Sequence, residues 1–134
     1  MAFDFYKSQI KPNSPDMIWK PATTSETFKV GETLKLSATG TITKCSGTDA
    51  PVYVCLADYV APSSNAAAIP VVEINPGQIY RVPLQAAGTA LKVGEKVTIH
   101  TDGLQVTATT TNGVAEIVKI EGTSVGDTVL VKLA

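Results

Sequence analysis

Residues 96–108, KVTIHTDGLQVTA, alternate apolar and polar side chains on both sides of an Asp-Gly pair. A period of two is typical of a half-buried β-strand, because successive side chains of a strand point to opposite faces. Asp102-Gly103 between two such runs predicts a hairpin, since type I′ turns need positive φ at both central positions. We therefore expect two antiparallel strands here, with Val97 and Ile99 pointing inward and Gly103 at positive φ.

The same alternation recurs along the rest of the chain. The other positions that it predicts to face inward are Leu34, Leu36, Ala38, Val52, Val54, Leu56, Tyr80, Val82, Leu84, Leu104, Val106, Ala108, Val129, Val131 and Leu133. Asn75-Pro76-Gly77 and Asn112-Gly113 supply further turn signals. No segment has an apolar period of 3.6 residues. The sequence therefore predicts an all-β fold, either a single small β-barrel or a β-sandwich.

The N-terminal segment differs from the rest of the chain. It holds three prolines, which disfavour helix and do not donate to a sheet ladder. We expect residues 1–27 to be an extended N-terminal arm and residues 28–134 to be the barrel or sandwich body. The alternative is a loose tail, or an arm that packs back on its own body. Its apolar side chains are candidate anchors for a partner, because aromatic residues dominate interfaces; they are Phe3, Phe5, Tyr6, Ile10 and Trp19.

Composition narrows the class of partner. The length of 134 residues fits one domain with one core. Eleven Lys and Arg against twelve Asp and Glu give a formal net charge of −1. Because phosphate binding needs a basic surplus, we expect no direct nucleic-acid partner. No apolar run is long enough to cross a bilayer and the first residues lack the apolar core of a secretory signal. We therefore expect no membrane partner and synthesis in the cytoplasm.

Candidate chemistry in the sequence is sparse. His100 is predicted to face outward beside a turn, where a solvated side chain is the ordinary expectation rather than a catalytic base. Cys45 and Cys55 are expected to be reduced and partly buried, with a disulfide as the alternative. Thr109-Thr110-Thr111 is either a polar strand end or a hydroxyl-lined sugar site. We expect that the protein is not an enzyme and that it has no catalytic residue, metal ligand or cofactor. Paired carboxylates in a cleft would instead indicate an enzyme.

One short motif recurs in the chain. Residues 28–32 (FKVGE) reappear as residues 91–95 (LKVGE), and residues 124–127 (SVGD) carry the same core. We interpret these as three uses of one turn and not as repeats, because their spacing is uneven. In each turn we expect Val to pack inward, Gly to permit the bend and the acid to face solvent. The alternative is an acidic metal site formed by Glu32, Glu95 and Asp127.

The C-terminal half carries a family resemblance. Residues 91–97 (LKVGEKV), 102–104 (DGL), 112–115 (NGVA) and 125–133 (VGDTVLVKL) resemble the small decoration, or cement, proteins of tailed-bacteriophage capsids. The resemblance implies a structural virion protein on the capsid exterior, without catalysis, whose partner is the major capsid protein. It further implies a homo-oligomer, with trimers favoured, that bridges neighbouring capsid subunits, and arms that order on the shell by strand addition.

Two rival functions stay open from the sequence. The first is another virion component, such as a head-fibre base or a tail adaptor, which would have the same kind of all-β fold. A carbohydrate-binding or adhesin-like β-domain would instead present a shallow aromatic face to a soluble sugar. The aromatic side chains outside the arm are few, namely Phe28, Tyr53, Tyr59 and Tyr80.

Overall fold

The computed structural model describes residues 1–9 and 16–134, and within these ranges the chain forms twelve β-strands and no helix. All strand pairs are antiparallel, so the all-β prediction is confirmed. No helix that might cross a membrane occurs in the described part of the chain. The strands are β1 (Asp4–Ser8), β2 (Met17–Pro21), β3 (Thr27–Phe28), β4 (Thr33–Leu36), β5 (Ile42–Lys44), β6 (Tyr53–Cys55), β7 (Tyr59–Val60), β8 (Ala68–Glu73), β9 (Gln78–Pro83), β10 (Lys96–Val97), β11 (Ala115–Ile120) and β12 (Thr128–Lys132).

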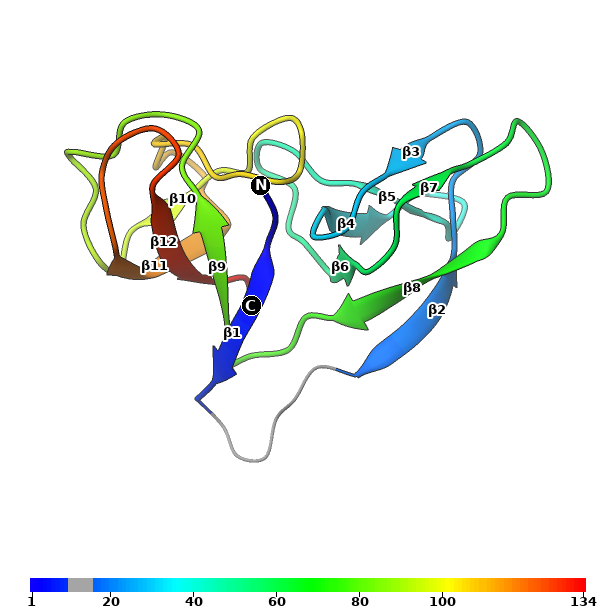
Figure 1. Cartoon of the computed structure of the whole chain (residues 1–134), viewed down its shortest axis with the longest axis horizontal. Coiled ribbons are helices and arrows are strands. Elements are labelled where there is room, and N and C mark those ends of the chain that lie inside the picture. Colours follow the sequence, from blue (N-terminus) through cyan, green and yellow to red (C-terminus); the bar gives the residue numbers. More distant parts are fainter. Residues whose placement is uncertain (10–15) are drawn as a thin grey trace.

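The strands build two five-stranded sheets that lie in two lobes (Figure 1). Sheet 1, in the order β2-β8-β6-β4-β5, belongs to the first lobe, which is residues 16–74. Sheet 2, in the order β1-β9-β12-β11-β10, belongs to the second lobe, which is residues 78–134, together with β1 from the N-terminal arm. β3 and β7 form a small sheet of their own in the first lobe. The predicted turn at residues 75–77 joins the two lobes, with Gly77 at a φ of 87°.

Buried apolar side chains form two clusters instead of the single core expected from the length. The larger cluster packs mainly under sheet 2 and the smaller one under sheet 1. β6 contributes to both clusters, Val54 to the larger and its neighbours Tyr53 and Cys55 to the smaller. This follows from the alternation of side chains along a strand. The centre of sheet 1 is therefore buried on both faces.

Most of the predicted inward positions are buried, among them Leu34, Val54, Tyr80, Val82, Leu84, Val97, Ile99, Leu104, Val106, Val129, Val131 and Leu133. The prediction is wrong for Leu36, Ala38, Val52 and Leu56, which are exposed. β4 and β6 are shorter than the alternation suggests, so these four residues lie at or beyond strand ends, where no neighbouring layer covers them.

The predicted chain reversal at Asp102-Gly103 is present, but the two predicted strands are not, because β10 ends at Val97 and pairs with β11 and no strand covers residues 104–108. The turn type differs as well. The Gly103 amide donates to the carbonyl of His100 at 2.9 Å, and Ile99 and Val106 form an antiparallel bridge across the reversal. Gly103 has a φ of 71°, as predicted, whereas Asp102 is not at positive φ. Because type I′ needs positive φ at both positions, the type I′ assignment is wrong.

The two lobes repeat one strand order and one set of registers. The strands β2-β8-β6-β4 of sheet 1 correspond in order to β9-β12-β11-β10 of sheet 2. Trp19 pairs with Pro70 in the first lobe in the way that Arg81 pairs with Leu130 in the second. An isolated parallel bridge follows the first strand in each lobe, joining Ala22 to Ile42 and Leu84 to Val106.

Main-chain hydrogen bonds at the recurring motif repeat as well. The amide of Gly31 donates to the carbonyl of Cys55 at 2.8 Å, and that of Gly94 donates to the carbonyl of Ile117 at the same distance. The motifs FKVGE and LKVGE thus occupy the same place in the two lobes. The interpretation that these two copies are not repeats is wrong, because the chain contains an internal structural repeat.

Candidate interaction surface

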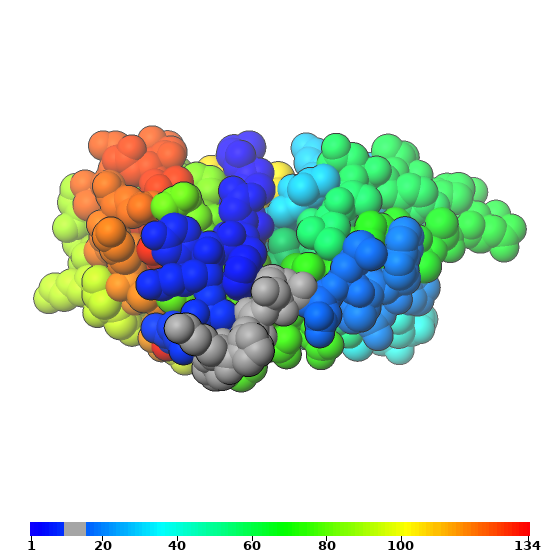
Figure 2. Space-filling model, turned by 60° about the horizontal axis from the view of Figure 1, so that its bottom comes forward, coloured from blue at the N-terminus to red at the C-terminus, as the bar shows by residue number. Residues whose placement is uncertain are grey.

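The described part of the N-terminal arm forms one outer strand in each sheet. β1 pairs with β9 in sheet 2, and β2 pairs with β8 in sheet 1. The described residues of the arm therefore pack on the protein's own body, which is one of the alternatives that the sequence leaves open. Deletion of residues 1–27 would therefore remove a strand from each lobe and expose β8 and β9 as new sheet edges. Figure 2 shows the segments that hold these two strands on one face of the molecule.

Phe3 fixes the beginning of the arm between the lobes. Its side chain is only 2% exposed and belongs to the larger core cluster. Its amide donates to the carbonyl of Gly31 in the first lobe at 2.9 Å, while the strand that follows pairs with the second lobe. A side chain on Gly31 would lie 2.3 Å from the Cβ of Ala2. The close approach of the arm therefore requires glycine at this position.

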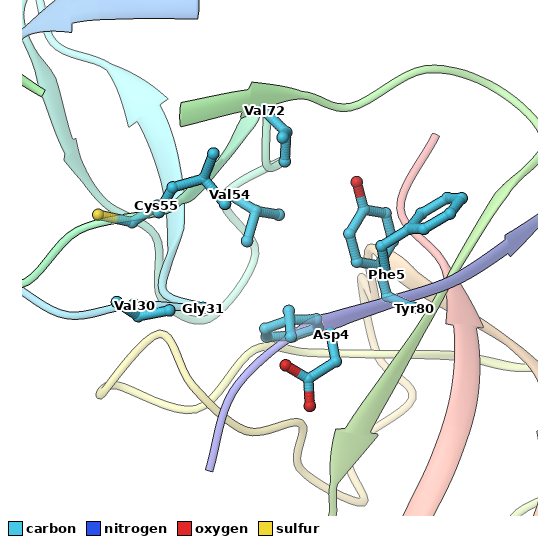
Figure 3. Close-up of a pocket in the computed structure, with 10 residues that line it drawn as sticks. Asp4, Phe5, Val30, Gly31, Val54, Cys55, Val72 and Tyr80 are labelled. Carbon is cyan, nitrogen blue, oxygen red and sulfur yellow. The ribbon is translucent and has the colours of Figure 1, made fainter. Parts of the chain in front are cut away.

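Next to Phe3 lies a small cavity of about 140 Å³ between the lobes. In Figure 3, Val54 and Val72 lie on one side of it and Phe5 and Tyr80 on the other. Binding pockets for small molecules usually have several hundred Å³ and a few convergent polar groups. This cavity is smaller and mostly apolar, so we interpret it as a packing gap between the lobes.

The predicted anchors divide into a buried and an exposed group. Phe3 is buried, as described above. Phe5, Tyr6 and Trp19 are 38%, 45% and 61% exposed. Ile10 lies outside the described residues. The structure thus places the exposed anchors on β1 and β2, while it assigns Phe3 to the core.

Phe5 and Tyr6 are held in place by side chains of β9. The ring of Phe5 meets the ring of Tyr80 edge to face, with the centroids 5.9 Å apart. The guanidinium of Arg81 lies 4.8 Å from the centre of the Tyr6 ring, a cation–π contact. Arg81 also donates two hydrogen bonds to Glu121, at 3.0 and 3.2 Å. These bonds hold the pKa of the Glu121 carboxyl below its ordinary value, so the pair stays charged at neutral pH.

Trp19 lies on β2, the outermost strand of sheet 1. Burial alternates along this strand, so that Met17, Trp19 and Pro21 are exposed while Ile18 and Lys20 are half-buried. The ammonium of Lys20 lies 5.6 Å from the ring centre of Tyr53, which fixes the inner face of the strand. The indole therefore points away from the first lobe on a strand that is itself well held.

The cysteines are free thiols, both buried. Burial raises the pKa of Cys45 to about 12 and that of Cys55 to about 11. Because the thiolate is the reactive form, neither is a nucleophile at neutral pH. His100, the one candidate base, is half-exposed beside the Gly103 turn. Within the described ranges, no three His, Cys, Asp or Glu side chains gather into a group that would hold a metal ion.

The three motif turns share one backbone geometry. Gly31, Gly94 and Gly126 all have positive φ, between 83° and 94°. In each turn the amide of the acidic residue donates to the carbonyl three residues before it, at 3.0 to 3.1 Å. Glycine at the third position with positive φ is typical of a type II turn. The second position points outward, which is why the prediction of inward valines is wrong: Val30, Val93 and Val125 are exposed.

The acids of these turns do not behave alike. Glu95 accepts a hydrogen bond from the amide of Lys92 at 2.7 Å, and Asp127 accepts one from the amide of Ser124 at 3.0 Å. Glu32 instead is 2% exposed, which contradicts its predicted place in solvent. The sequence shows no sign of this, since Glu32 and Glu95 stand in nearly identical motifs. The difference comes from what packs on each turn.

Comparison with known proteins does not assign the chain to a family. A scan against protein-family models finds no match, and a search of curated proteins finds none either. The resemblance to capsid decoration proteins therefore stays a hypothesis, for which the arm surface on β1 and β2 is the feature to test.

Proposed function

We propose that the protein is a structural virion protein that binds the outer surface of a phage capsid through the arm surface, defined as the exposed side chains of β1 and β2, and so bridges neighbouring capsid subunits. The partner is the major capsid protein, and no catalysis is involved. The resemblance of the C-terminal half supports this proposal. The distribution of aromatic side chains supports it independently.

The aromatic distribution is the observation that carries the proposal. The three exposed aromatic residues are Phe5, Tyr6 and Trp19, all of them on β1 or β2. The remaining aromatic side chains, Phe3, Phe28, Tyr53, Tyr59 and Tyr80, are buried or half-buried. Exposed Trp and Tyr are the residue types that most often dominate binding energy. Their confinement to two neighbouring outer strands, which lie on one face of the molecule (Figure 2), favours a protein partner over a scattered, solvated surface.

The repeat refines the proposed architecture. Each lobe has four corresponding strands and a parallel bridge that returns toward the first of them. We infer two small, incompletely closed barrels in tandem, in place of one barrel or sandwich. The arm contributes a strand to each lobe, so a partner that contacts β1 and β2 touches both lobes at once. This arrangement suits a protein that bridges two neighbouring subunits of a shell.

Substitutions on the arm surface test the proposal by their effect on head binding. We expect Trp19→Ala to weaken binding to intact phage heads by about 2 kcal/mol, or roughly 30-fold, because an exposed Trp at an interface centre is a typical hot spot. Tyr6→Ala should act in the same direction. Val93→Ala is the matched control, since Val93 is an exposed apolar side chain away from the arm.

Co-sedimentation of each purified variant with heads gives the affinities. Equal affinities for the wild type, Trp19→Ala and Val93→Ala would contradict a role of the arm surface. Binding to no head at all, together with capture on a glycan array, would favour the carbohydrate-binding alternative.

A further inference from the structure

Glu32 lies where the two lobes meet. The reversal at His100–Gly103 reaches from the second lobe onto β4, so that the carbonyl of Gly103 accepts bonds from both the amide and the hydroxyl of Thr33, at 2.9 and 3.0 Å. In Figure 1 this loop is the yellow segment that follows β10. A Cβ built on Gly103 would lie 3.0 Å from the Cγ of Glu32 and 2.9 Å from the Cγ of Lys44. The loop thus covers the Glu32 side chain.

The buried carboxyl lacks the bond that its counterpart makes. Glu95, at the same place in the second lobe, accepts a hydrogen bond from its own turn. The Oε1 atom of Glu32 is buried and has no hydrogen-bond partner among the described residues. None of the ion pairs found in those residues includes Glu32. A buried carboxylate without a partner is unfavourable, whereas a protonated carboxyl is tolerated.

Charged groups of four neighbouring segments face this carboxyl. Lys44 of β5 and Lys29 of the same turn favour the charged form, while Glu26 and Asp102 disfavour it. Glu26 is itself engaged, since its carboxylate accepts bonds from Thr43 and from the amide of Lys44. His100 stands at the start of the covering loop. Burial outweighs the two lysines and raises the pKa of Glu32 from 4.5 to about 7.

We propose that Glu32 makes the contact between the two lobes proton-dependent, with the Gly103 loop closed on Thr33 when Glu32 is protonated and loosened when Glu32 is charged. This inference is independent of capsid binding. Glu32 binds its proton more tightly when the Gly103 loop is closed on Thr33 than when the loop is open. The stability of the closed contact therefore falls as the pH rises from about 4.5 to about 7, and stays low above that.

The carboxyl of Glu32 can be followed directly by carbon-detected NMR on the wild-type protein. We expect it to titrate near pH 7, and the amide of Thr33 to shift with the same midpoint. In Glu32→Gln the Thr33 response should vanish. Glu95→Gln, the same substitution at the repeated position, should leave it unchanged. A Thr33 response that persists in Glu32→Gln would assign the titration to another group and overturn the proposal.

Opening can be measured separately by the accessibility of a buried thiol. Cys45 donates its amide to the carbonyl of Thr33 at 2.9 Å, and its side chain is buried in the larger cluster. With 4,4′-dithiodipyridine and peptide mapping, we expect Cys45 in the wild type to react at pH 8.5 on the order of tenfold faster than in Glu32→Gln. Below a pH of about 4.5, where Glu32 is protonated in both the closed and the open contact, the two rates should agree. The charge of Glu32 also raises the pKa of the Cys45 thiol, an effect that by itself would make Glu32→Gln the faster variant and therefore cannot produce the expected order. Equal rates at pH 8.5, or a Glu32 carboxyl that titrates near 4.5, would overturn the proposal.

Discussion

Phe3→Ala is expected to lower the free energy of unfolding by about 3–5 kcal/mol, the usual cost of removing a buried phenylalanine ring. Phe3 belongs to the larger core cluster although it lies in the third position of the chain. Its loss would leave a cavity between the lobes beside the existing one of about 140 Å³. Urea unfolding monitored by the single tryptophan, Trp19, measures the effect.

Phe5→Ala is the matched control for this prediction. Phe5 has the same chemistry and lies two residues further along, but it is 38% exposed and contacts chiefly Tyr80. We expect it to cost about 1 kcal/mol, the scale of one edge-to-face aromatic contact. Equal costs for Phe3→Ala and Phe5→Ala would mean that the arm is not part of the core.

Gly31→Ala is expected to cost about 3 kcal/mol or more. Alanine at a φ of 83° is strained by about 1–2 kcal/mol. The new Cβ would also collide with Ala2 and with the amide of Phe3, which lie 2.3 and 3.1 Å away. The arm must then move, and Phe3 loses part of its burial. Urea unfolding again gives the size of the loss.

The internal repeat supplies the control for Gly31. Gly94 has a φ of 94° at the same place in the second lobe, and a Cβ there would meet nothing within 4 Å. We expect Gly94→Ala to show only the backbone strain of about 1–2 kcal/mol. Ala2→Gly should partly rescue Gly31→Ala and leave Gly94→Ala unchanged. Additive effects of Ala2→Gly and Gly31→Ala would show that the two residues do not touch.

Local patterns in the sequence predict the strands well and their partners poorly. The alternation around Val97 and Ile99, and that of the last strand, marks side chains that are buried, but Thr98 and Leu130 between them are buried as well. The pairing of β1 with β9 joins residues far apart in the chain. The local pattern of residues 1–8 does not specify β9 as the pairing strand. The sequence alone therefore predicts an arm that is not paired with the body.

The repeat and the buried acid were missed for a related reason. Outside the motif the two lobes share little sequence, since equivalent positions such as Trp19 and Arg81 only need to fit a strand. Strand order and register are conserved between the lobes by main-chain bonds, which many sequences satisfy. Glu32 and Glu95 have the same neighbours along the chain, and only the loop from the other lobe makes one of them buried. Tertiary contacts of this kind leave no periodic signal.

The candidate surface was partly predictable. The concentration of aromatic residues in the arm is visible in the sequence, and Phe5, Tyr6 and Trp19 are exposed in the structure. That Phe3 is a core residue depends on a contact with Gly31, which the sequence does not reveal.

The measurement that tests the proposed function most directly is the saturation of intact phage heads with the purified wild-type protein, followed by quantification of the bound protein after sedimentation. We predict saturable binding in a fixed ratio to the major capsid subunit, with an affinity roughly 30-fold lower for Trp19→Ala. Binding that never saturates, or that is absent at every concentration while the protein remains folded, would contradict the proposed function.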